Sequence, residues 1–196
     1  MKRRTALSVG LLVAVPLAWY AFAWFSYPSD REPSGAYLRV MSAVNRGKPE
    51  EFFAYTETRA QHACYTIRDY RRKALKLVQR AFPKEEYERF EKVHREVASA
   101  PDGPDVFAIY ARRNGWLDRL RRDMSGIDRV EVSGERATVQ TIKGTRYPFR
   151  RRDNGIWGLT LFTPTLDGEA ERAARDYERI EKAARDYERD RKRKRR

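Results

Sequence analysis

The pattern of apolar and polar residues divides the chain into an apolar beginning and a long, highly charged remainder. No charged residue occurs between Arg4 and Asp30, and residues 6–25 are almost entirely apolar. A helix of twenty residues is about 30 Å long, which matches the hydrocarbon thickness of a bilayer. Aromatic residues gather at its far end, where Trp and Tyr favour the lipid–water interface. The pattern predicts a transmembrane helix over residues 6–27.

The flanks of this span predict its orientation. Basic residues precede it, namely Lys2, Arg3 and Arg4. Because basic flanks stay in the cytoplasm, we expect residues 1–5 to be a cytoplasmic stub and the domain to lie outside the cytoplasm. The alternative is a signal peptide, since Ala21-Phe22-Ala23 is a small-x-small site whose cleavage would release a secreted domain. The length of the span and its bulky aromatic residues favour an uncleaved anchor in the cell membrane, followed by a linker over residues 28–34.

After the linker, apolar residues recur every three or four positions, which is the period of amphipathic helices. Ser34 is expected to cap the first helix, and Pro49 to begin a second one. A longer helix is predicted over 63–82, where Arg68, Arg72, Lys76 and Arg80 recur on one side. Another follows over about 85–97. Asp105 is expected to cap a helix that reaches about Met124.

After Gly126 the period changes to two, which is typical of β-strands. Strands are predicted over 127–133, 136–143, 145–152 and 156–163. Pro148 cannot donate to a strand ladder, so we expect it at an edge or a bulge. In the third strand Arg146, Arg150 and Arg152 share one face, as in any half-exposed strand. The fold class is therefore predicted as α+β over residues 35–166, with a helical half followed by a four-stranded antiparallel meander.

A charged amphipathic helix is predicted next, over residues 167–188. The sequence AARDYER occurs twice there, at 173–179 and 183–189. The apolar positions, spaced 4-3-4-3 as in a coiled-coil seam, are Ala173, Tyr177, Ile180, Ala184 and Tyr187. Two heptads are too short to decide the partner of that seam. Helix-mediated self-association and packing back onto the domain both stay open.

Charge is concentrated at the two ends of the chain. The net charge is +14, and residues 189–196 contain seven basic residues and one acidic residue. We expect this tail to be disordered and to contact anionic lipid or an anionic envelope polymer. The candidate contact residues are Arg189, Arg191, Lys192, Arg193, Lys194, Arg195 and Arg196. The composition also suits nucleic acid, but only if the topology is reversed.

The sequence contains no recognisable catalytic or metal-binding motif. His62, Cys64 and His94 lack the companion ligands that a structural zinc site needs, so we expect no metal and no cofactor. There is no Gly-x-Ser-x-Gly elbow and no glycine-rich phosphate loop. As the one cysteine, Cys64 excludes an internal disulfide and is expected to be buried. No catalytic residue is identified.

Two stretches of the pattern are familiar. Residues 45–53 read NRGKPEEFF after the first helix, and the strands carry Val130-Glu131-Val132, Tyr147-Pro148-Phe149 and Gly155-Ile156-Trp157. Over about 35–60 and 126–163 the chain resembles the nuclear-transport-factor-2-like superfamily, which includes ketosteroid-isomerase-like proteins. The resemblance implies helices packed on a curved antiparallel sheet around a pocket, with residues 62–124 as an elaboration. No acidic residue here matches the base that the isomerases use.

The predicted function is accordingly a single-pass, membrane-anchored, non-catalytic binding or scaffolding module of the cell envelope. Two alternatives stay open. One is a small-substrate enzyme with a cone-shaped pocket, as the resemblance implies. The other is a nucleic-acid-binding protein, which requires the domain to lie in the cytoplasm.

Overall fold

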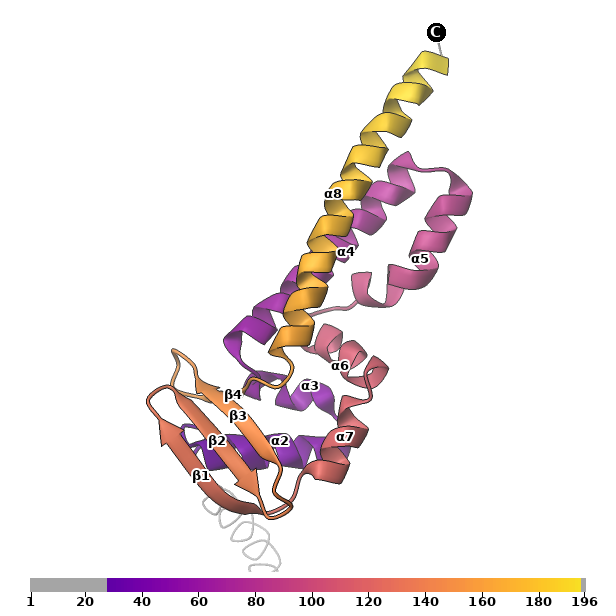
Figure 1. The fold of residues 1–196 in the computed structure, drawn as a ribbon. Coiled ribbons are helices and arrows are strands. Elements are labelled where there is room, and N and C mark those ends of the chain that lie inside the picture. The colour runs from indigo at the N-terminus through magenta and orange to yellow at the C-terminus, as the bar shows by residue number, and fades with distance from the viewer. Residues whose placement is uncertain (1–27, 195–196) are drawn as a thin grey trace, which may run out of the picture.

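The computed structural model describes residues 28–194 and has an α+β fold, as predicted. Figure 1 shows a sheet with helices packed beside it at one end of the molecule, and two long helices that run from there to the other end. In chain order the elements are α2 (Pro33–Arg46), α3 (Pro49–Phe52), η1 (Phe53–Tyr55), α4 (Thr58–Ala81), α5 (Lys84–Ala98), α6 (Gly103–Arg113), α7 (Trp116–Asp123), β1 (Ile127–Ser133), β2 (Arg136–Thr141), β3 (Arg146–Arg151), β4 (Trp157–Leu159) and α8 (Thr163–Lys194).

The predicted membrane span over 6–27 lies outside the described residues. Between residues 28 and 194, no helix is long and apolar enough to cross a membrane.

Local sequence signals set the helix boundaries, with small differences from the prediction. Ser34 is not the cap of α2, because Pro33 already occupies the first turn and Glu32 lies at the N-cap position. Asp105 is not the cap of α6 either. The cap is Asp102, and Asp105 supplies the reciprocal half of a capping box. The helix predicted to reach Met124 is two helices, because Gly115 adopts a left-handed conformation (φ 62°) between α6 and α7.

The sheet is an antiparallel meander in the order β1-β2-β3-β4. Contrary to the prediction, Pro148 lies in an interior strand without a bulge in β3. Its carbonyl accepts a hydrogen bond from the Thr160 N–H (3.0 Å). The nitrogen and the carbonyl of one residue point toward the same neighbouring strand, so the ring nitrogen of Pro148 faces the end of β4. The missing N–H therefore costs only a hydrogen bond at the end of the ladder. The fourth strand is also shorter than predicted, because the chain turns after Leu159 and begins α8 at Thr163.

The inner face of the sheet packs against α2, and an aromatic cluster joins it to the other helices. The ring centroids of Tyr37 and Tyr147 lie 5.5 Å apart between α2 and β3. Phe107 of α6 lies 5.3 Å from Phe162, edge to face, and Trp116 lies 4.6 Å from the same ring. Each such ring contributes on the order of 2–3 kcal/mol through burial. This core holds the sheet, α3, α6 and α7 together.

The long helix α4 packs along α8, with α5 on its other side (Figure 1). We call α4, α5 and the part of α8 beside them the stalk. Tyr70 of α4 and Phe82, the C-cap residue of α4, pack against Tyr177 and Tyr187 of α8, with ring centroids 5.6 and 4.9 Å apart. The heptad seam of α8 is thus used within the chain. Of the two alternatives for that seam, packing back onto the domain is the one observed.

The predicted end of this helix was wrong. A disordered tail was expected from residue 189, but α8 continues as helix to Lys194. Arg191 donates to the carbonyl of Ala81 at the end of α4 (3.0 Å), and Arg189 pairs with Asp186 one turn earlier. Basic residues also interact favourably with the negative end of a helix dipole. These interactions extend the helix in spite of repulsion between like charges.

Candidate functional site

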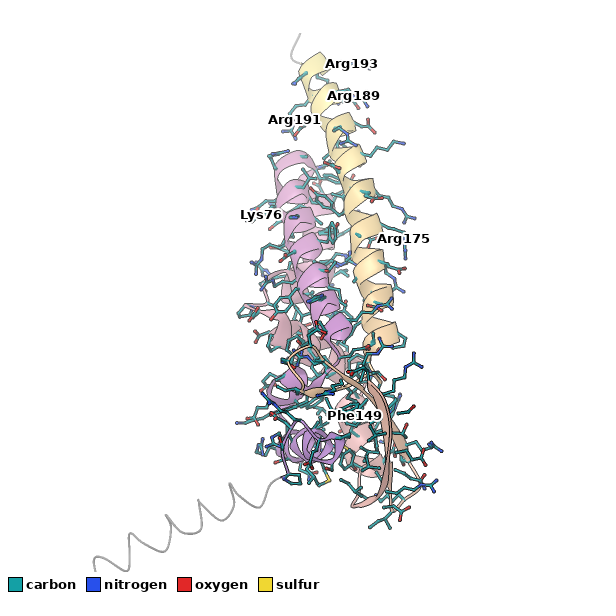
Figure 2. The ribbon with its side chains drawn as sticks, turned by 90° about the vertical axis from the view of Figure 1, so that its left-hand side faces the viewer. Lys76, Phe149, Arg175, Arg189, Arg191 and Arg193 are labelled. Carbon is teal, nitrogen blue, oxygen red and sulfur yellow. The ribbon has the colours of Figure 1, made fainter. Side chains whose placement is uncertain are left out.

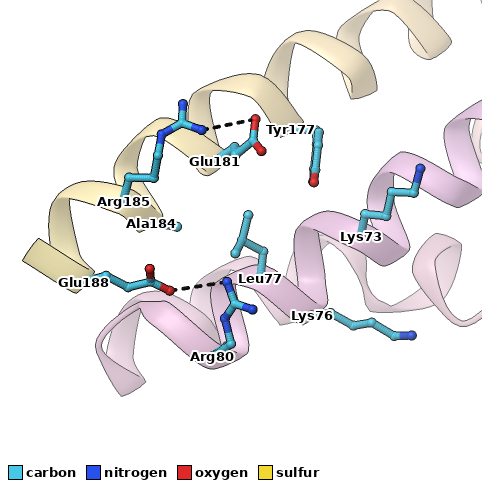
Figure 3. Close-up of a pocket in the computed structure, with 9 residues that line it drawn as sticks. All are labelled: Lys73, Lys76, Leu77, Arg80, Tyr177, Glu181, Ala184, Arg185 and Glu188. Carbon is cyan, nitrogen blue, oxygen red and sulfur yellow. Dashed lines mark hydrogen bonds and ion pairs between the residues drawn. The ribbon is translucent and has the colours of Figure 1, made fainter.

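A groove of about 580 Å³ runs between α4 and α8 in the outer half of the stalk (Figure 3). Its lining residues are Lys73, Lys76, Leu77 and Arg80 from α4, with Tyr177, Glu181, Ala184, Arg185 and Glu188 from α8. Leu77, Tyr177 and Ala184 supply its apolar lining, and charged residues from both helices supply its rims. Ala184 is buried between the two helices at this groove.

The rims of the groove are basic on balance. Arg80 lies 3.3 Å from Glu188 across the groove, and Arg185 lies 3.6 Å from Glu181 along α8 (Figure 3). Both pairs are exposed, so each contributes less than about 1 kcal/mol and can be exchanged for another anion. Lys76 makes no ion pair with the described part of the chain, and Figure 3 shows its amino group directed away from α8. The groove therefore favours an anionic occupant.

Only half of the basic stripe predicted on α4 takes part in this surface. Arg68 donates to the carbonyl of Pro101 and to the Asp102 carboxylate, both at 3.1 Å. Arg72 donates to the carbonyls of Ala98 and Ala100. These two side chains hold the connection between α5 and α6 against α4. Their role is structural, while Arg80 and the base of the Lys76 side chain line the groove.

The predicted contact residues of the tail lie beyond the groove, at the end of α8. Five of the six residues from 189 to 194 are basic, and all of them are exposed. Lys192, Arg193 and Lys194 make no ion pair with any residue in the described range. Figure 2 shows Arg191 and Arg193 on different sides of the helix, so the charge surrounds it. Arg195 and Arg196 lie outside the described residues. We call residues 189–194 the basic end of α8.

The basic end lies far from the sheet. Its helix has 32 residues, which corresponds to a length of about 48 Å. Pro28, the first described residue, lies at the opposite end of the molecule, where its carbonyl accepts a hydrogen bond from Arg39 of α2 (2.7 Å). Figure 1 shows the last turns of α8 extending past the α4–α5 hairpin. Tertiary packing thus holds the basic end away from the point where the chain enters the fold.

The three residues considered as metal ligands do not form a site. Within residues 28–194, no three His, Cys, Asp or Glu side chains are placed to hold a metal ion. Cys64 is buried, as predicted, and burial raises the pKa of its thiol to about 12. Burial, reinforced by Arg71, lowers the pKa of His94 to about 4, and its ring stacks on Phe90 (4.3 Å). Both residues are neutral parts of the packing at pH 7.

The space between the sheet and the helices, where the resemblance implies a pocket, is occupied by packed side chains. Tyr37, Phe52, Phe107 and Phe149 are fully buried there. The hydroxyl of Tyr147 is a buried polar atom with no hydrogen-bond partner in the part of the chain that the structure describes. Burial raises the pKa of Tyr147, so its phenol stays neutral.

Comparison with known proteins adds no assignment to these surfaces. No protein-family model matches the chain, and no curated protein or solved structure shows significant similarity to it. The resemblance to the nuclear-transport-factor-2-like superfamily stays a prediction.

Proposed function

We propose that this protein is a non-catalytic binding module of the cell envelope, anchored by residues 6–27 in the cell membrane with its domain outside the cytoplasm. Its basic end and the adjoining groove of the stalk bind an extended anionic polymer. The observation that supports this most is the cluster of positive charge at the end of the long helix α8. Five cations cluster on the last turns of α8, at the end of a helix of about 48 Å that packs along α4.

The length of the stalk favours an envelope polymer over the lipid of the anchoring membrane. Electrostatic attraction in solution falls off over roughly 8–10 Å at physiological ionic strength. If the chain leaves the membrane at residue 28, an upright stalk holds its basic end several times that distance from the lipid headgroups. Strong attraction then requires an anion that reaches the end of the stalk. Flexible polyanions of the envelope do so, whereas the headgroups of the same bilayer do not.

The test measures binding of fluorescent poly-L-glutamate to the full-length protein in nanodiscs of neutral lipid. The variant Lys192→Gln/Arg193→Gln/Lys194→Gln removes three cations that have no partner among the described residues. Each cation near an anionic surface contributes about 1 kcal/mol, so we expect affinity to fall on the order of a hundredfold at low salt. The matched control, Arg172→Gln/Arg175→Gln/Arg179→Gln, removes the same charge nearer the sheet and should change the affinity only a few-fold.

Equal losses in the two variants would overturn the proposed location, because net charge alone would then explain binding.

Topology is tested by Asp190→Cys, an exposed position, with a membrane-impermeant thiol reagent in intact cells. Cys64 is buried and does not interfere. Labelling of a full-length protein supports the proposal. Labelling only after lysis would contradict it and favour nucleic acid, and a shorter mature mass would indicate a secreted domain.

A further inference from the structure

The outer, solvent-facing side of the sheet carries two pairs of arginines, one on β1 and β3 with β2 between them and one on the neighbouring strands β2 and β3. Arg129 and Arg146 flank Gln140 of β2 in one row of the sheet. Arg136 of β2 lies directly opposite Arg150 of β3 in another. Like charges close together on one face of a sheet destabilise it, and an anion between the two arginines offsets the repulsion.

The first pair has its anion within the protein. The two oxygens of Glu131 lie 3.2 Å from Arg129 Nε and 2.9 Å from Arg146 Nη2. One carboxylate therefore bridges two guanidinium groups from strands on either side of β2. This arrangement shows how the sheet accommodates such a pair.

The second pair has no bridging carboxylate among the residues that the structure describes. Glu57, which precedes α4 and is 6% exposed, lies 3.0 Å from Arg150 Nη1. Its other oxygen accepts a hydrogen bond from the hydroxyl of Thr163 (2.7 Å). Both oxygens of Glu57 are thus engaged without reaching Arg136. No ion pair or hydrogen bond joins the Arg136 side chain to any other residue from 28 to 194.

A cleft opens over this incomplete pair. Its volume is about 400 Å³, within the range of small-molecule sites. The lining residues are Glu57, Arg59, Arg136, Ala137, Thr138, Pro148, Phe149, Arg150, Thr160, Thr163 and Pro164. Figure 2 shows Phe149 near the sheet end of the molecule, far from the basic end of α8. Among the charged residues of the lining, arginines outnumber carboxylates three to one.

We propose that this cleft binds a small molecule through a carboxylate or phosphate group that bridges Arg136 and Arg150, as Glu131 bridges the first pair. The guanidinium group presents a planar fork of donors that matches both kinds of oxyanion. The ion pair with Glu57 holds the Arg150 side chain in place, so this arginine loses little side-chain freedom when a ligand binds. Threonine hydroxyls and the two prolines of the lining contact the remainder of the ligand. This site does not depend on the function proposed for the stalk.

The test uses the full-length protein in non-ionic detergent, with the arginine Nε–Hε signals followed by NMR. Inorganic phosphate and acetate are titrated separately, so that the two ligand chemistries are distinguished. Signals of Arg136 and Arg150 should shift saturably with at least one of them. In Arg136→Gln, where a charge-assisted hydrogen bond is lost, the dissociation constant should rise about tenfold or more. Arg136→Lys keeps the charge but not the fork, and should bind with intermediate affinity.

The matched control is Arg129→Gln, which removes an arginine of the same sheet face whose anion is already supplied by Glu131. Its dissociation constant should stay within about twofold of the wild type, because it does not line the cleft. The inference is overturned if Arg129→Gln and Arg136→Gln weaken binding equally, since the anions then sense only net charge. It is also overturned if neither anion saturates the Arg136 and Arg150 signals of a folded wild-type protein.

Discussion

The contact that joins α8 to the middle of α4 is a buried ion pair between Arg71 and Asp176. The Arg71 side chain is 5% exposed, and its Nη1 lies 2.7 Å from Asp176 Oδ2, whose side chain is 30% exposed. The two sides of this pair therefore differ in their access to water. Asp176→Ala leaves a guanidinium group buried without its carboxylate, which costs about 3 kcal/mol or more of unfolding free energy.

The reciprocal change is expected to be milder. In Arg71→Leu the remaining carboxylate of Asp176 can be hydrated, so we expect a loss of about 1–2 kcal/mol. The double variant Arg71→Leu/Asp176→Ala replaces both charges with apolar groups and should lie within about 1 kcal/mol of the wild type. The double-mutant cycle thus predicts strong coupling, with the pair setting the register of α8 on α4 more than the total stability.

Urea unfolding of the full-length protein in detergent measures these differences, with the fluorescence of the buried Trp116 and Trp157 as one signal and circular dichroism as the other. Coinciding transitions justify a two-state analysis. A loss below about 1 kcal/mol for Asp176→Ala, or a double variant as unstable as the sum of the singles, would refute the reasoning. The first result means that water replaces the carboxylate, and the second that the two side chains act independently.

Four other residues give predictions of the same kind. Burial lowers the pKa of His94 from 6.5 to about 4, so between these pH values the unfolded chain binds a proton that the folded chain does not. The unfolding free energy should therefore fall by about 1–2 kcal/mol as the pH falls from 6.5 to 4. In His94→Gln this pH dependence should be absent when urea unfolding is compared at pH 6.5 and pH 4. Burial raises the pKa of Cys64 to about 12, so its thiol should react with a chromogenic thiol reagent only after denaturation. The absorbance of the reagent measures this reaction. Tyr147→Phe removes a buried hydroxyl that has no hydrogen-bond partner within residues 28–194, and should raise the unfolding free energy by about 1 kcal/mol. In Gly158→Ala the new Cβ would lie 2.6 Å from the Thr56 carbonyl oxygen, so thermal unfolding should show a loss of about 1–3 kcal/mol.

The candidate anion sites differ in how far the sequence revealed them. The basic residues at 189–194 are adjacent in the chain, so composition alone identified them. Composition did not predict that they continue a helix, in which Arg191 donates to the Ala81 carbonyl, a contact between residues 110 positions apart. The cleft at Arg136 and Arg150 was not predicted at all. Alternation placed Arg150 on an exposed strand face, but the strand register and the position of Glu57 complete the site.

The period of the apolar residues by itself determined the α+β class and the order of helices and strands, because these depend on neighbours within a few positions. The burial of Cys64 was predicted from its being a lone free thiol. Tertiary structure decided how those elements use their side chains. It directed the heptad seam of α8 onto α4, assigned Arg68 and Arg72 to backbone carbonyls, and left Arg136 opposite Arg150 without a shared carboxylate. Such outcomes depend on which distant residues meet, and neither period nor composition encodes that pairing.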